Sequence, residues 1–130
     1  MMTRTLTNLF TLGVLAGMVA CAGTSRGLEA YRTDTSSLLG TRSAQVKACY
    51  DDALKTDANL AGMVTVQFIV EKQTGVVAHA AVALDQTSAP PALGQCVVKA
   101  LDGLVLAPPD RNEGRATFVY DFKPSPAPAS

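Results

Sequence analysis

The sequence predicts an α+β fold: helix–hairpin–helix–strand, with a three-stranded antiparallel sheet and two helices on one face. Two segments place apolar residues at the three- and four-residue spacing of a helix. Two others alternate apolar and polar residues, as half-buried strands do, and a third is small and apolar throughout. Because the helical segments flank the first two strands, an antiparallel sheet covered on one side is the expected architecture.

The first expected helix begins near Thr41 or Ser43, either of which can cap its N-terminus. Residues 56–59, three of which are polar, end it. The apolar positions of this helix fall on one face and are Val46, Cys49, Tyr50, Ala53 and Leu54.

A β-hairpin follows. Its first strand has inward positions at Val64, Val66, Phe68 and Val70, which alternate with Thr65, Gln67, Ile69 and Glu71. Residues 72–75 form the turn, because Gly75 can adopt a positive φ. Residues 76–84 are small and apolar and form the second strand.

The second helix begins at Pro90 and Pro91, with Ser88 as a possible cap, and ends at Gly103. Its apolar face consists of Leu93, Cys96, Val97, Ala100 and Leu101. The last strand alternates again: its residues are Ala116, Thr117, Phe118, Val119, Tyr120, Asp121 and Phe122.

The N-terminus is typical of a secretion signal. Arg4 precedes an apolar run over residues 9–20, which is shorter than the roughly 20 residues that a membrane-spanning helix needs. The alternative is a buried core helix. The run ends in Met18, Val19, Ala20 and Cys21, which resembles the bacterial lipoprotein signal. This resemblance implies a lipid on the Cys21 thiol, and therefore a membrane-anchored protein that faces the periplasm.

The domain boundaries follow from this interpretation. Residues 1–20 are the lipoprotein signal peptide, and residues 21–37 are small and polar, as expected of a flexible tether. Residues 38–123 are the folded domain, and residues 124–130 are a Pro-rich disordered tail. Ala22 after the lipidated position favours the outer membrane over the inner membrane.

Two cysteines remain if Cys21 is acylated. Cys49 and Cys96 form an even pair in an oxidising compartment, which favours a disulfide. Such a bond would stabilise the domain by about 4 kcal/mol in the chain-entropy model. A metal or redox pair and two free thiols are the alternatives.

The folded part resembles the AgmX/PglI C-terminal domain, a relative of the TonB C-terminal domain. The segments that carry the resemblance are residues 46–51, 62–70, 74–77, 95–97 and 118–122. Leu104, Leu106 and Pro108 stand where the family has an aromatic-rich stretch, so that region departs from the pattern. The energy-transducing role of TonB depends on an inner-membrane helix and is not carried over.

Composition argues against several functions. The chain has 11 basic and 11 acidic residues, so neither a nucleic-acid surface nor a polybasic lipid-binding patch is expected. His79 is the only histidine, and Asp51 and Asp52 are adjacent on a helix, where their side chains diverge. We expect no enzymatic activity, no cofactor and no metal.

Binding is the function that the resemblance implies. TonB-like domains hold an extended peptide by adding it to a sheet edge. The expected edge is the last strand, over residues 116–122, although its alternation equally suits a purely structural core strand. The expected partner is an envelope protein or a segment of one, and the resemblance implies a motility, transport or secretion assembly as its setting. The alternatives are a structural envelope lipoprotein without a peptide groove and, third, a thiol enzyme or hydrolase.

Overall fold

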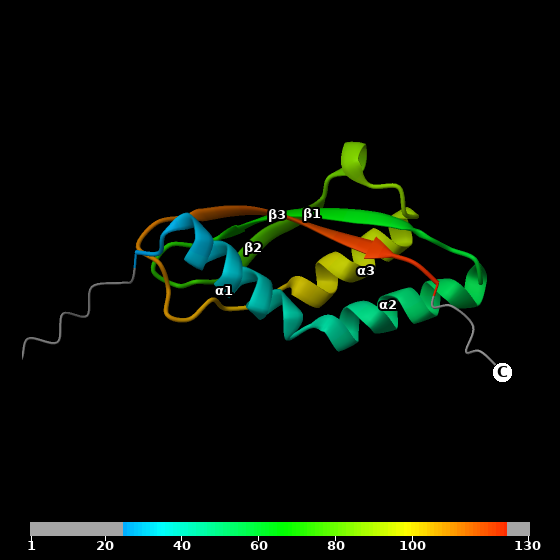
Figure 1. The fold of residues 1–130 in the computed structure, drawn as a ribbon, viewed down its shortest axis with the longest axis horizontal. Helices are drawn as coiled ribbons and strands as arrows, with labels where there is room; N and C mark the ends of the chain where they lie inside the picture. Colours follow the sequence, from blue (N-terminus) through cyan, green and yellow to red (C-terminus); the bar gives the residue numbers. More distant parts are fainter. Residues whose placement is uncertain (1–24, 125–130) are drawn as a thin grey trace, which may run out of the picture.

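The computed structural model describes residues 25–124. Its elements are α1 (Leu28–Gly40), α2 (Ser43–Thr56), β1 (Gly62–Val70), β2 (Val77–Val82), the short 3-10 turn η1 (Leu84–Gln86), α3 (Pro91–Leu101) and β3 (Gly114–Phe122). The sheet has the order β2-β1-β3, and both pairings are antiparallel. The helices lie on one side of it, and η1 projects from the other side (Figure 1). The predicted α+β class and the antiparallel sheet are therefore confirmed.

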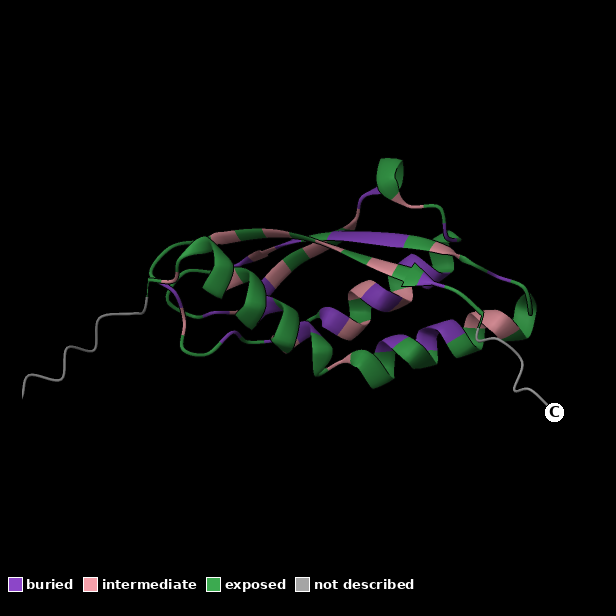
Figure 2. Ribbon diagram, in the orientation of Figure 1, coloured by how far each residue is buried: buried purple, intermediate pink, exposed green. Residues whose placement is uncertain are grey.

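The core lies between the inner face of the sheet and the helices. Every second residue of β1 faces inward, from Val64 to Val70, and none of these is more than 2% exposed. Val97 and Leu101 of α3 are fully buried against them. In Figure 2 the buried positions gather on the facing sides of the strands and helices. Removal of this apolar surface from water is the main stabilisation of the fold.

The first helix of the structure corrects the expected domain boundaries. The flexible tether predicted over residues 21–37 is wrong from Leu28 onward, because α1 occupies residues 28–40. Tyr31, Thr35 and Leu39 recur on one side of this helix, and the last two are buried. A third helix, in addition to the two expected, therefore contributes Leu39 to the core. The signal peptide, Cys21 and residues 125–130 lie outside the described residues.

Two local expectations fail for a common reason, which is that residues 83–89 fold back on β1. Ser88 does not cap α3, because its Oγ accepts a hydrogen bond from the Met63 N–H at 2.9 Å. Thr65 is 2% exposed, and its hydroxyl donates to the Gln86 carbonyl at 2.7 Å. The second strand therefore ends at Val82 rather than at Leu84.

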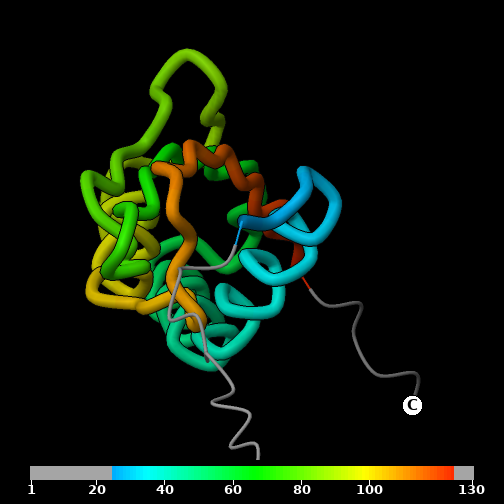
Figure 3. Tube along the Cα trace, turned by 90° about the vertical axis from the view of Figure 1, so that its left-hand side faces the viewer, coloured from blue at the N-terminus to red at the C-terminus, as the bar shows by residue number. Residues whose placement is uncertain are grey.

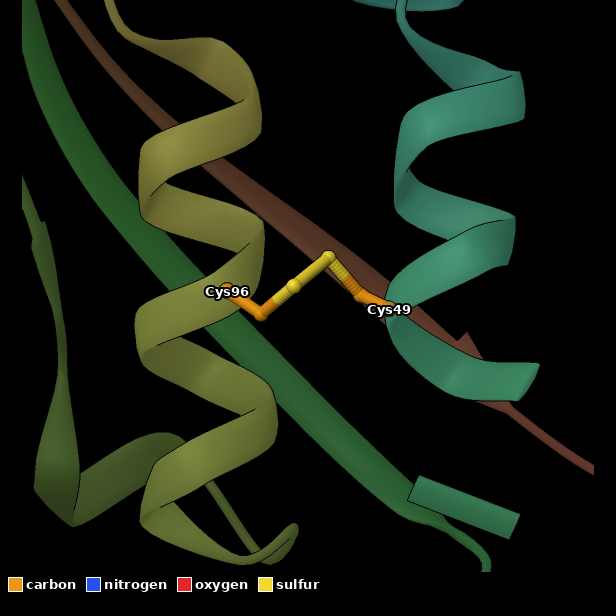
Figure 4. The surroundings of a disulfide bond; sticks show 2 residues. All are labelled: Cys49 and Cys96. Carbon is orange, nitrogen blue, oxygen red and sulfur yellow. A yellow bond between two sulfur atoms is a disulfide. The ribbon is translucent and has the colours of Figure 1, made fainter. Parts of the chain in front are cut away.

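A disulfide joins the two helices that the sequence predicted. The sulfur atoms of Cys49 on α2 and Cys96 on α3 are 2.05 Å apart, and the Cα atoms are 5.7 Å apart. Figure 4 shows the bond crossing the space between the two helices. α2 packs under β3, where the rings of Tyr50 and Phe122 have centroids 5.0 Å apart. α3 packs under β2, where Gly94 leaves room for the Val82 side chain. The bond therefore connects the two halves of the helical layer.

Candidate functional site

β3 lies at one edge of the sheet and has no strand on its other side among residues 25–124. It runs from Gly114 to Phe122, slightly longer than the predicted 116–122. It pairs with β1 over its whole length without a shift in register, from Gly62 opposite Phe122 to Val70 opposite Gly114. The strand is thus regular along its entire unpaired side.

The backbone groups on this unpaired side can be assigned. In β1, the N–H and C=O groups of Met63 and Thr65 are bonded to residues 83–89, on the side away from β3. Backbone groups alternate sides along an antiparallel strand, so the even-numbered residues of β1 face β3. Their partners in β3 are also even-numbered. The N–H and C=O groups of Arg115, Thr117, Val119 and Asp121 consequently point outward from the edge.

The side chains of these same four residues are exposed on the outer face of the sheet. Val119 is half exposed, at 50%. A charged pair stands at each end of the strand: Arg115 with Glu113 at 3.4 Å, and Lys123 with Asp121 at 3.1 Å. Two β-branched residues between two opposite-charge pairs therefore line the open edge.

The inner face of β3 carries a row of aromatic rings. The ring centroids of Phe118 and Tyr120 are 4.9 Å apart, and those of Tyr120 and Phe122 are 6.1 Å apart. Burial raises the pKa of Tyr120 to about 12. Its hydroxyl is buried and has no hydrogen-bond partner within the part of the chain that the structure describes. The row packs partly into the core, and Phe118 and Tyr120 remain partly accessible.

A groove of about 490 Å³ separates α1 from the first half of β3. The two elements lie side by side in Figures 1 and 3. Tyr31 packs over Gly114, so a Cβ at position 114 would overlap the Tyr31 hydroxyl. Beyond this contact, the groove separates α1 from β3. Thr35 is 5% exposed, lines the groove and has a hydroxyl without a partner among residues 25–124. The other lining residues are Leu28, Arg32, Ser36, Phe68, Arg115, Ala116, Thr117 and Phe118.

The α1 wall of this groove is held in place by Arg26. The backbone N–H of Arg26 donates to Oδ2 of Asp110 at 2.9 Å, and its side chain, 4% exposed, donates to Asp34 at 2.6 Å. Asp110 is 2% exposed and also accepts from the Asn112 N–H at 2.9 Å. These backbone hydrogen bonds lower the pKa of Asp110, because they favour the carboxylate. The residues before α1 are thereby fixed to the loop that leads into β3.

The groove was missed at the level of sequence because α1 was missed. A signal was present: Leu28, Tyr31, Leu38 and Leu39 recur at helical spacing. Thr35 occupies the remaining inward position, and the many small polar residues around it resemble a linker. The edge strand itself was predicted, and all seven of its predicted residues lie in β3.

The residues considered for catalysis are not brought together. His79 is exposed on β2 with a positive φ of 53°, whereas the cysteines are bonded to each other beneath the sheet. Asp51 and Asp52 are exposed and pair with Lys47 and Lys55. Within residues 25–124, no three His, Cys, Asp or Glu side chains gather as a metal site requires. Helices of the length and apolarity needed to cross a membrane are also absent from that range.

Comparison of the chain with protein-family models, with curated proteins and with solved structures found no match. The resemblance to the AgmX/PglI domain therefore stays a prediction.

Proposed function

We propose that this protein is a non-catalytic binding module that holds an extended protein segment by strand addition to β3. One observation carries the proposal: the outward N–H and C=O groups of residues 115, 117, 119 and 121 form a regular, unpaired row. An added strand would satisfy these groups through main-chain hydrogen bonds, which give affinity largely independent of sequence. Selectivity would come from the side chains beside the row.

The groove between α1 and β3 supports this proposal. A strand pairs at about 4.8 Å from its neighbour, and inward side chains of an added strand would enter the groove. Phe68, Ala116 and Phe118 give the groove an apolar wall, whereas Arg32 and Ser36 provide polar groups on the α1 side. An extended segment that alternates apolar and polar residues fits such a site.

The proposed setting is the cell envelope. The apolar run of residues 9–20 followed by Cys21 supports a lipid-anchored protein on the periplasmic side, with the outer membrane favoured. A disulfide between Cys49 and Cys96 suits that oxidising compartment. The partner is then an envelope protein or an extended segment of one, as the AgmX/PglI resemblance implies for motility, transport or secretion assemblies.

A structural lipoprotein without a peptide site is the second candidate. The contact of Phe122 with Tyr50, and the packing of Phe118 and Tyr120 against the core, favour it, because a purely structural strand would pack in the same way. The two candidates differ only in whether the outward side of β3 is occupied in the cell.

Photo-cross-linking in intact cells tests that difference. A benzophenone amino acid replaces Val119 on the open edge or, as the control, Ala44 on the exposed side of α2. We expect one dominant cross-linked product from position 119 and none from position 44. Equal and diffuse labelling from both positions would contradict the proposal and favour the structural candidate.

A proline variant tests the mechanism of binding. Thr117→Pro removes an N–H that points away from β1, so the ladder between β1 and β3 is retained. We expect the cross-linked product from position 119 to fall by about tenfold, because one edge hydrogen bond is lost and the proline ring hinders pairing. Phe118→Pro is the comparison variant: its N–H faces β1, so it should lower the thermal stability of the fold itself. Unchanged capture by a folded Thr117→Pro variant would exclude strand addition at this position.

A further inference from the structure

We infer that the segment added to β3 is the β3 strand of a second copy of this chain. The inference rests on the proposed function, since it names the partner of the same edge. Two copies related by a two-fold axis would form one continuous sheet of order β2-β1-β3-β3-β1-β2. A two-fold axis perpendicular to the sheet makes the two β3 strands antiparallel.

Geometry limits the registers that such a pair can adopt. Only the odd-numbered residues of β3 present backbone groups outward, so odd-numbered residues must lie opposite odd-numbered residues. Within this rule, the three registers with the greatest overlap of the two strands place the axis at Thr117, Phe118 or Val119, and each places a different set of side chains opposite one another.

The charges select one of these registers. When Phe118 lies on the axis, opposite Phe118 of the second copy, Arg115 lies opposite Asp121 of the second copy. Glu113 then lies opposite Lys123 of the second copy. The axis generates each pair twice, so four opposite-charge pairs flank the interface. With Thr117 on the axis, Glu113 would face Asp121, and with Val119 on the axis, Arg115 would face Lys123. Like charges directly opposite are destabilising, so both neighbouring registers are disfavoured.

The uncharged positions agree with this register. On the outer face, Thr117 lies opposite Val119 of the second copy, and both are exposed β-branched residues that favour strand pairing. On the inner face, Tyr120 lies opposite Ala116 of the second copy, so a large side chain meets a small one. Ala116 also lines the groove beside α1, which leaves space for the ring. β3 is therefore self-complementary in charge and in size.

Cysteine cross-linking tests the register directly. Opposite residues in a hydrogen-bonded antiparallel pair have Cα atoms about 5.5 Å apart, which is within disulfide range. Thr117→Cys and Val119→Cys are exposed substitutions, and in the inferred register each new cysteine lies opposite the other and not opposite itself. Cells produce the full chain as either variant alone or as both together, and the thiol oxidant diamide is added before non-reducing electrophoresis.

We expect about tenfold more dimer when both variants are present than with either variant alone, because only the mixed pair satisfies the distance. Equal dimer in all three cultures would indicate random collision and would overturn the inference. No dimer in any culture would overturn it as well. If position 119 still captures a different protein by photo-cross-linking, the binding module stands and only the identity of its partner is wrong. If it captures nothing, both proposals fail.

A charge exchange gives an independent readout. Arg115→Glu places like charges opposite Asp121 twice across the interface and should weaken self-association roughly tenfold in sedimentation equilibrium. The double variant Arg115→Glu/Asp121→Arg restores opposite charges between copies, although it creates like-charge neighbours within each strand. Recovery of association in the double variant is therefore expected only from pairing between copies. A double variant as weak as the single one would contradict the register.

Discussion

The two edges of the sheet are protected in opposite ways. The β2 edge is covered where the strand begins: the Val77 N–H donates to the Leu104 carbonyl, and the Leu106 N–H donates to the Gly75 carbonyl, both at 2.8 Å. Farther along, a bulge at His79 interrupts the pairing of β2 with β1. The β3 edge has neither feature within the described residues, and its register with β1 is continuous over nine residues.

This difference indicates which edge is available to a partner. Proteins commonly block exposed edges with bulges, covering segments or charges, because an open edge can pair with other chains. Here the covering segment and the bulge are both on β2, and β3 retains only charges, arranged in complementary order. The contacts that hold the covered edge and the helices beneath both edges can each be removed by substitution.

Removal of the disulfide should have the largest effect, because it connects the helices under the two edges. For the double variant Cys49→Ala/Cys96→Ala, the free energy of unfolding should fall by about 4 kcal/mol, the chain-entropy value for cysteines 47 residues apart. Urea titration with and without a reductant measures the loss. The reductant should destabilise the original chain and leave the double variant unchanged. An equal response of both proteins would show that the bond is absent in solution.

Substitution of Gly75 should displace the segment that covers the β2 edge, and its effect on the free energy of unfolding should be slightly smaller. Gly75 has a φ of 73°, and a Cβ at this position would overlap the backbone carbonyl of Leu106. Gly75→Ala should therefore lower the free energy of unfolding by about 3 kcal/mol through backbone strain and displacement of the covering segment. Gly103→Ala is the matched control, because Gly103 has a φ of 76° with open space around it. Its expected cost, from the left-handed conformation alone, is about 1 kcal/mol. Equal losses in urea titration would exclude the contact with Leu106 as the cause.

The smallest predicted effect concerns Asp110 and depends on pH. Its carboxylate accepts hydrogen bonds from Arg26 and Asn112, and its carbonyl accepts from Gln73 in the turn between β1 and β2. Because its pKa in the folded chain is below the ordinary 3.8, its contribution to stability is complete above that value and disappears as pH falls through the folded-state pKa.

Asp110→Asn should therefore lower the thermal midpoint more at pH 7 than at pH 2, because the carboxylate loses its charge as the pH falls. Asp85→Asn, at an exposed position in η1, is the control and should have little effect at either pH. The Asp110 carboxylate would have no stabilising role if its variant lost equal stability at both pH values.

The elements with strong periodicity could be predicted from sequence. The alternation of Val64, Val66, Phe68 and Val70 identified the inner face of β1, and the two cysteines on helical apolar faces predicted the bond between helices. Residues 76–84 are almost uniformly small and apolar, so no local signal distinguished the bulge at His79 or the end of β2 at Val82. Register and bulges depend on neighbouring strands, which a single segment does not encode.

The candidate site was predicted in part. The alternation of residues 116–122 predicted the strand, and its place at an edge followed from a small antiparallel sheet. The groove required α1, whose buried Thr35 and short polar side chains resemble a linker. The direction of the Thr117 and Val119 backbone groups could be assigned only from the hydrogen bonds that residues 83–89 make to β1. Those two segments lie about 20 residues apart in the sequence, so no local pattern predicts the contact.

The anchoring of Arg26 limits how far the domain can move from Cys21. Arg26 is the fifth residue after Cys21, and a fully extended chain of five residues spans about 18 Å at most. A lipid on Cys21 would therefore orient the domain, with Asp110 and the beginning of β3 near the bilayer. In the antiparallel pair, the two copies of Gly114 lie roughly 27 Å apart. With a lipid anchor near each end of the paired strands, the strands would run parallel to the membrane surface rather than perpendicular to it.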